Sequence, residues 1–198
     1  GHYMTCLQDK DFTDVVETDE TWGLGTMKNS VGVHQWNPHN LLKSSEDFSS
    51  SDWSKTDTTV TSNAAMAPDG TLTADKISHT STSAKIVQQA STTASVAHGV
   101  GVFTQYIDHQ WVRIALDGTD VWVDIQNGVV GTDDTSATEV VALADGWFYW
   151  LFPASVPSAT PTLYFHLAAS DGGSLETSGT YAYIWGAHLY RNDQGGMA

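Results

Sequence analysis

Residues 111–126 read WVRIALDGTDVWVDIQ, and this stretch decides the fold. On both sides of its Asp-Gly turn signal, apolar side chains recur at every second position, as in a β-hairpin with one buried face. We expect a two-residue loop at Gly118-Thr119, with Gly118 at the first position of a type II′ turn. This register puts six apolar side chains on one face, which we expect to pack against the core: Leu116 opposite Val121, Ile114 opposite Val123 and Val112 opposite Ile125.

The other face of this hairpin carries two indoles beside polar side chains. The same register places Trp111 across from Gln126, Arg113 across from Asp124, and Ala115 across from Trp122. An indole can cover the C–H face of a pyranose while arginine, carboxylate and amide groups bind its hydroxyls. The pattern predicts a glycan-binding or interface platform of Trp111, Arg113, Trp122, Asp124 and Gln126. The other interpretation is that the arm, a loop or a neighbouring subunit covers this face, because surface tryptophan pairs often mark buried contacts.

Residues 40–190 read as one all-β domain. Thr, Val, Ser and aromatic residues dominate, and Gly-containing turn signals recur every 8–12 residues, as in sandwiches and barrels. The pattern predicts a jelly-roll β-sandwich, followed by a C-terminal tail at 191–198. We expect strands at residues 57–63, 71–79, 84–90, 95–107, 110–117, 120–127, 137–143, 146–153, 161–168 and 180–190.

Aromatic residues outside the hairpin favour core positions. Residues 147–152 are apolar at every position, which predicts a central strand buried on both faces. Strand alternation places Tyr181, Tyr183, Trp185 and Leu189 on one face, which we expect to pack inward. Phe48 and Trp53 lie near a turn, and we expect them to plug one end of the sandwich rather than bind a ligand.

Residues 1–39 differ from the rest of the chain. Six carboxylates crowd between Asp9 and Glu20, and no sustained hydrophobic period follows. We expect an extended N-terminal arm for anchoring or oligomerisation, with one short strand at 31–36. The first residues lack a basic and apolar leader, so we expect no signal peptide.

The charge balance excludes several kinds of partner. Eight Lys and Arg residues face 23 Asp and Glu residues, a net charge of −15. Nucleic-acid binding needs a basic surface, and anionic membranes repel an acidic one, so we expect neither partner. No apolar run is long enough to span a bilayer. The single cysteine, Cys6, cannot form an intrachain disulfide.

Catalytic and metal-binding motifs are absent from the sequence. There is no nucleophile elbow, P-loop or dinucleotide fingerprint, so we expect a non-enzymatic protein. His34 and His39 do not have zinc-ligand spacing. Asp133 and Asp134 beside Gly131 form a weak Ca²⁺ candidate, since hard cations prefer clustered oxygens; the other interpretation is a solvated turn. We expect no other cofactor.

Several short sequence motifs give the domain a resemblance to a known family. The motifs are Asn40-Leu41-Leu42, Glu46-Asp47-Phe48-Ser49, Ala67-Pro68-Asp69-Gly70-Thr71, Ala74-Asp75, residues 123–131, Asp145-Gly146-Trp147 and Trp185-Gly186-Ala187. Together they resemble the carbohydrate-binding-module-like β-sandwiches of phage virion proteins such as head decorations, head spikes and tail fibres. Two positions depart from that family, which often has Tyr-Arg where Phe148-Tyr149 stands and Gln-Leu-Glu where residues 188–190 read His-Leu-Tyr.

The resemblance implies a non-enzymatic phage protein on the virion surface. The arm would dock to capsid or fibre proteins of the same virion, and the sandwich would contact cell-surface glycans. Many copies, as a homo-oligomer, would add avidity to weak single sites. The alternatives are a purely structural capsid cement protein without a ligand, a sandwich-fold polysaccharide-degrading enzyme domain, and a secreted bacterial binding module.

Overall fold

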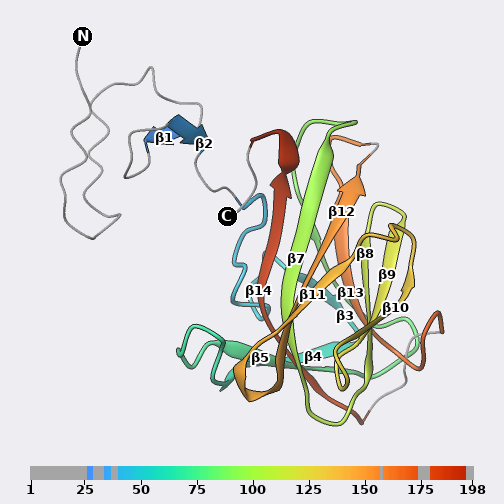
Figure 1. Ribbon diagram of the computed structural model, residues 1–198. Helices are drawn as coiled ribbons and strands as arrows, with labels where there is room; N and C mark the ends of the chain where they lie inside the picture. Colours follow the sequence, from blue (N-terminus) through green and yellow to red (C-terminus); the bar gives the residue numbers. More distant parts are fainter. Residues whose placement is uncertain (1–25, 29–33, 37–39, 157, 174–178, 195–198) are drawn as a thin grey trace.

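The computed structural model describes residues 26–28, 34–36, 40–156, 158–173 and 179–194. Within them, two six-stranded antiparallel sheets form a sandwich (Figure 1). The first, called the β8 sheet, has the order β10 (Val129–Asp133), β9 (Thr119–Asp124), β8 (Trp111–Leu116), β13 (Thr162–Ala168), β6 (Lys85–Gln89), β3 (Ser54–Thr56). The second, called the β7 sheet, has the order β11 (Glu139–Ala142), β12 (Trp147–Ser155), β7 (Ala97–Tyr106), β14 (Ala182–Arg191), β5 (Ala74–His79), β4 (Thr58–Ala65).

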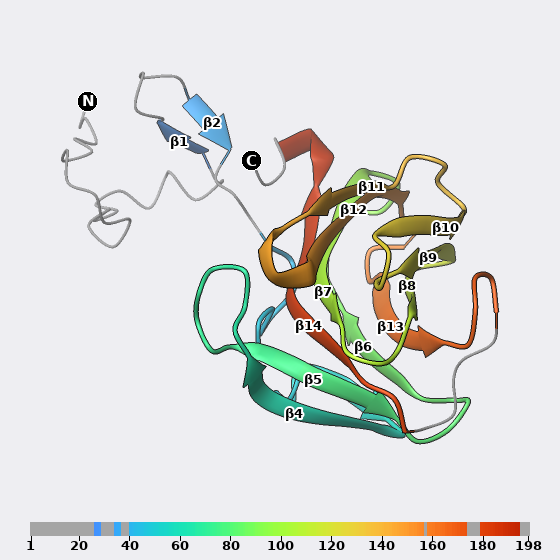
Figure 2. The ribbon, with the colours of Figure 1, turned by 60° about the horizontal axis from the view of Figure 1, so that its bottom comes forward.

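This architecture confirms the predicted all-β jelly-roll sandwich. The chain crosses repeatedly between the two sheets, which Figure 2 shows as two curved layers. Two short 3-10 helices complete the described elements, η3 (Ala144–Gly146) and η4 (Asn192–Gln194). Among the described residues, no helix is long and apolar enough to cross a membrane.

The arm contributes one small hairpin to the described residues. β1 (Thr26–Lys28) pairs antiparallel with β2 (His34–Trp36). β2 lies within the strand predicted at 31–36, and β1 was not predicted. The remainder of the arm lies outside the described residues, so its role in anchoring or oligomerisation stays a prediction.

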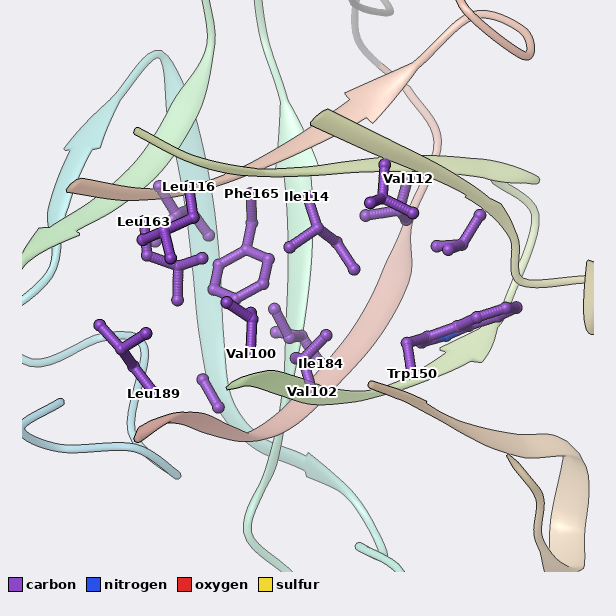
Figure 3. Close-up of a cluster of buried hydrophobic side chains, with 14 of the residues drawn as sticks. Val100, Val102, Val112, Ile114, Leu116, Trp150, Leu163, Phe165, Ile184 and Leu189 are labelled. Atoms are coloured by element: carbon purple, nitrogen blue, oxygen red, sulfur yellow. The ribbon is translucent and has the colours of Figure 1, made fainter. Parts of the chain in front are cut away.

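The core lies between the sheets and follows from strand alternation. Val100 and Val102 of β7 and Trp150 of β12 face Ile114 of β8 and Phe165 of β13 (Figure 3). Each is at most 1% exposed. Burying a side chain of this size stabilises the fold by about 1.5–3 kcal/mol, so these alternating positions fix which side of each strand faces inward.

Phe48 and Trp53 pack into this core, as predicted. Their ring centroids lie 4.7 Å apart, and each lies 5.8 Å from the ring of Phe165. The indole Nε1 of Trp53 donates to the Ser44 carbonyl at 2.9 Å, so its one polar atom is satisfied. The opening segment is also held by Asp75, whose carboxylate accepts from the backbone amide of Phe48 at 2.7 Å.

The β8–β9 hairpin has a different turn from the predicted one. Leu116 pairs with Thr119, so the loop is Asp117-Gly118, and both residues have positive φ, 49° and 95°. Two consecutive positive φ values define a type I′ turn, which Asp-Gly favours over type II′. The register therefore differs by two residues from the predicted one. A shift of two keeps every side chain on its face, so the predicted core face is confirmed while the predicted cross-strand partners are wrong.

A bulge in β14 overturns the predicted shared face of residues 181–189. The register shifts between Trp185 and His188, and Gly186 takes a left-handed φ of 59°. Beyond the bulge the alternation reverses, so Leu189 lies in the main core while Tyr183 and Trp185 point to the outer side of the β7 sheet. Tyr181 precedes the strand and is 36% exposed.

A second hydrophobic cluster lies on that outer side. The indole Nε1 of Trp147 donates to the Met66 carbonyl at 3.2 Å, and that of Trp185 donates to Thr73 Oγ1 at 2.9 Å. The loop before β5 thereby covers one end of the outer face. β12 is a central strand, as predicted, but its outer side chains Tyr149 and Leu151 are only half-buried. The cluster comprises Ala67, Ala74, Trp147 and Trp185, with Ala65, Phe103 and Tyr183 packed against it.

Candidate functional site

The outer face of the β8 sheet carries the predicted tryptophans and arginine. Trp122 of β9 lies directly opposite Arg113 of β8, which in turn lies opposite His166 of β13. Two residue pairs further along the strands, Trp111 lies opposite Ala168. We call the group Arg113, Asp120, Trp122, Tyr164 and His166 the arginine face.

Arg113 is positioned by one aromatic and one acidic neighbour. Its guanidinium carbon lies 5.3 Å from the centroid of the Trp122 ring, a cation–π contact. Its Nη2 donates to Asp120 Oδ2 at 2.7 Å, and the two side chains are 27% and 22% exposed. Half-exposed ion pairs contribute about 1 kcal/mol or less, so this pair orients Arg113 more than it stabilises the fold.

The predicted Arg113–Asp124 pair is wrong, because the register shift moves Asp124 opposite Trp111. Asp124 is 5% exposed and accepts hydrogen bonds at 2.7–3.0 Å from Gln110 Nε2, the Gln126 amide, and the Asn127 amide and Nδ2. Burial raises the pKa of Asp124, but these bonds outweigh it and hold the pKa below its usual range. Asp124 therefore anchors the turn after β9.

Gln126 is also displaced from its predicted position. It follows the end of β9 and is exposed, with its backbone amide held by Asp124. The predicted opposition of Gln126 to Trp111 is therefore wrong. Of the five predicted platform residues, Trp111, Arg113, Trp122 and Asp124 lie on the outer side of the β8 sheet, with Asp124 buried opposite Trp111.

Two aromatic side chains of β13 join this face. The rings of Tyr164 and His166 stack with centroids 5.7 Å apart and planes 10° from parallel. Lys85 Nζ of β6 lies 5.9 Å from the Tyr164 ring. Burial lowers the pKa of His166 to about 4, so the imidazole is neutral at pH 7. Alternation in residues 162–168 could have placed Tyr164 and His166 outward, but no local signal makes β13 the neighbour of β8.

Two donors on the arginine face have no partner among the described residues. Arg113 Nε and Trp122 Nε1 are both buried and unbonded. A buried donor without an acceptor costs about 1–3 kcal/mol. The two atoms belong to side chains that lie directly opposite each other and are in contact. The two unpartnered donors therefore lie in the same part of the face.

Trp111 lies at the side of the face and is partly covered. A β-carbon on Gly131 of β10 would be 2.6 Å from Trp111 Cζ3, so only glycine admits the indole there. The loop after β13 approaches the same point, where the Asp171 carboxylate accepts from the Thr132 amide at 2.6 Å. Trp122, rather than Trp111, is the indole in contact with Arg113.

The carboxylates of the weak Ca²⁺ candidate, Asp133 and Asp134, already accept hydrogen bonds from backbone amides. Asp133 accepts from the Thr135 amide at 2.8 Å and the Thr138 amide at 3.0 Å, and Asp134 accepts from the Asp120 amide at 2.9 Å. Burial raises the pKa of Asp133, but these and the Thr hydroxyl bonds outweigh it and lower the pKa overall. In the described part of the chain, no three His, Cys, Asp or Glu side chains gather as a metal site. Ca²⁺ binding stays an untested prediction.

Comparisons with known proteins found distant similarity in structure alone. No protein-family model and no curated protein matches the chain. It is similar to the enzymatically active domain of bacteriophage CBA120 tailspike protein 4, with 12% identity, a TM-score of 0.46, and coverage of 77% of this chain and 21% of that one. The chain thus spans about a fifth of the tailspike structure.

Two carbohydrate-binding modules are also similar to the chain. TmCBM61, solved with β-1,4-galactotriose, has 15% identity and a TM-score of 0.46 over 77% of this chain and 99% of that one. The xylan-binding CBM22-1 domain of Paenibacillus barcinonensis Xyn10C has 10% identity and a TM-score of 0.45 over 77% and 91%. At these values no binding residue is carried over from them to this chain.

Proposed function

We propose that this protein is a non-enzymatic carbohydrate-binding module that contacts glycans through the arginine face. The observation that carries the proposal is the contact of Trp122 with Arg113. Trp122 Nε1 and Arg113 Nε are both donors without a partner among the described residues. A saccharide combines apolar C–H surface with hydroxyl oxygens in one ring. An indole beside two buried, unpartnered N–H groups complements both parts of such a ring.

The polar partners of Arg113 fit the same ligand. Asp120 can accept from a hydroxyl while still bound to Arg113, because a carboxylate has several lone pairs. The Tyr164 hydroxyl can both donate and accept, and the neutral His166, whose Nδ1 donates to the Ala84 carbonyl at 3.3 Å, offers Nε2 as an acceptor. Small-molecule binding sites typically combine aromatic side chains with a few polar groups held in fixed positions, and the arginine face has this composition.

We further propose that the module belongs to a phage virion surface protein, in a capsid decoration, head fibre or tail fibre. The support is the set of short sequence motifs between Asn40 and Ala187 that resemble phage virion β-sandwiches, together with the acidic arm that precedes them. The arm would attach the module to capsid or fibre proteins of the same particle. The alternative of a capsid cement protein is favoured by one observation, the loop at Asp171 that approaches Trp111.

A glycan-array screen with matched variants tests the binding proposal. Trp122→Ala removes the indole, and Arg113→Gln removes the guanidinium while keeping a long polar side chain. Tyr181→Ala is the control, since it removes an aromatic ring that is 36% exposed and outside the arginine face. We expect the first two variants to lose at least about tenfold in affinity and the control to retain binding. An intact protein that binds no glycan, with Trp122→Ala failing to assemble onto a particle, would establish the cement alternative.

A further inference from the structure

The outer face of the β7 sheet carries a second group of aromatic and polar side chains. Gly101 of β7 lies between Leu151 and His188 on the neighbouring strands, and Phe103 lies between Tyr149 and Trp185. These residues project from the side of the sandwich opposite the arginine face, because they lie outside the core on the other sheet. We call this group the tyrosine face: Gly99, Gly101, Phe103, Tyr149, Trp185, His188 and Tyr190.

Two glycines of β7 shape the tyrosine face. A β-carbon on Gly99 would be 2.5 Å from the Tyr190 hydroxyl oxygen, and one on Gly101 would be 2.9 Å from Tyr149 Cζ. Both distances are too short for real atoms, so the phenol ends lie directly over the β7 backbone. Phe103 stacks on Tyr149 with centroids 4.4 Å apart, and its ring lies 6.2 Å from His188. Aromatic rings therefore surround a stretch of bare backbone.

Three polar groups on this face have no protein hydrogen bond among the described residues. They are the hydroxyls of Tyr149 and Tyr190 and the imidazole of His188. Burial raises the pKa of Tyr149 to about 12 and lowers the pKa of His188. At neutral pH all of these groups are uncharged, and each hydroxyl and the imidazole can both donate and accept.

The charge around this face argues against an anionic ligand. Burial and the nearby Glu139 carboxylate raise the pKa of Tyr190, so a negative charge acts on the face. No lysine or arginine belongs to the tyrosine face, and the whole chain carries a net charge of −15. A ligand that fits aromatic planes, three neutral hydrogen-bonding groups and a negative field is an uncharged polyhydroxylated ring.

We propose that the tyrosine face is a second saccharide site, specific for neutral sugars and independent of the arginine face. Tyr149 and Tyr190 bind sugar hydroxyls above β7, His188 supplies a third hydrogen bond, and Phe103 contributes apolar surface. Two sites on opposite sides of one sandwich allow a single chain to bridge two glycan chains. Each weak site then adds to the avidity of the other.

The test is affinity electrophoresis through gels containing neutral polysaccharides, with xylan and β-1,4-galactan as probes and alginate as the acidic probe. The variants are made in the Trp122→Ala protein, where the arginine face is disabled. Tyr149→Phe/Tyr190→Phe removes both hydroxyls and keeps both rings, so the packing is retained. Tyr181→Phe is the matched control, because it removes a tyrosine hydroxyl that belongs to neither the arginine face nor the tyrosine face and keeps its ring. Thermal melting of each variant verifies its fold.

We expect a neutral polysaccharide to retard the Trp122→Ala protein, and the double phenylalanine variant to bind it at least about tenfold more weakly. The Tyr181→Phe control should be retarded like its parent, and alginate should retard none of them. Equal retardation of the double variant and its parent would overturn the proposal, as would a Trp122→Ala protein that neither neutral probe retards. The comparison of Trp122→Ala with the intact protein separately tests the arginine face, so the two failures are distinguishable.

Discussion

The guanidinium of Arg113 contacts the indole of Trp122 across the β8–β9 ladder, with 5.3 Å between Cζ and the ring centroid. Their strands bring them directly opposite each other, and Asp120, two residues along β9 from Trp122, accepts a hydrogen bond from Arg113 at 2.7 Å. The outer face is thus built from neighbours that a type I′ hairpin specifies.

Replacing Arg113 with Lys should weaken glycan binding and leave the fold intact. Lysine keeps the charge but loses the planar guanidinium and its unpartnered Nε–H. We expect affinity to fall roughly tenfold, while the free energy of unfolding changes by about 1 kcal/mol or less. Isothermal titration and urea denaturation measure the two effects. Unchanged affinity would remove Arg113 from the site.

The Asp117-Gly118 turn predicts opposite responses to two substitutions at residue 117. Asp117→Asn should be tolerated, because asparagine favours positive φ, whereas Asp117→Val should destabilise the protein by about 1–2 kcal/mol. Urea denaturation gives both values. A type II′ turn at Gly118-Thr119 would leave residue 117 in ordinary strand geometry, and valine there would then be harmless.

Asp75 should be among the most sensitive polar positions. Its carboxylate is 1% exposed and accepts from the amides of Phe48 at 2.7 Å and Asn63 at 3.0 Å. Asp75→Ala leaves both amides unpaired, and we expect a loss of about 2–4 kcal/mol in the free energy of unfolding. Asp52→Ala, at an exposed carboxylate, is the control and should cost about 0.5 kcal/mol or less. Equal losses in the two variants would contradict this role.

Stability should decline as the pH falls below neutrality. Burial lowers the pKa of His79 to about 3 and that of His166 to about 4, below the ordinary value of 6.5. The unfolded chain therefore binds protons first, so their contribution is complete above pH 6.5 and is lost as the pH falls toward 3–4. Denaturation midpoints between pH 7 and pH 4 measure this loss, and His166→Gln should flatten part of the slope. A midpoint independent of pH across this window would contradict buried neutral imidazoles.

Local patterns predicted which side chains face inward, but not which strands are neighbours. Alternation identified Val112, Ile114 and Leu116 as core positions, and a register error of two residues preserved that result. The same error predicted Asp124 as the partner of Arg113, whereas the observed partner is Asp120. Side-chain identity on each face is a local property, whereas cross-strand pairing depends on the turn type.

The features that the sequence did not predict arise from tertiary context. The bulge at Gly186 reverses the alternation of β14, and a lone glycine in a strand does not reveal its φ. β10 was not predicted because it is short and lies at a sheet edge next to the Asn127-Gly128 turn. Tyr164 and His166 reach the arginine face only because β13 lies beside β8, a pairing between segments about 50 residues apart in the sequence.

The central claim is that a glycan binds at Trp122, and an NMR titration of the tryptophan indole N–H signals tests it most directly. The signal of Trp122 is assigned by its absence in Trp122→Phe, and the fully buried Trp53 serves as the internal reference. With a glycan selected on the array, we predict a saturable shift of the Trp122 signal, because its unpartnered Nε1–H gains an acceptor, and no shift of Trp53. A bound glycan that leaves the Trp122 signal in place would contradict the account.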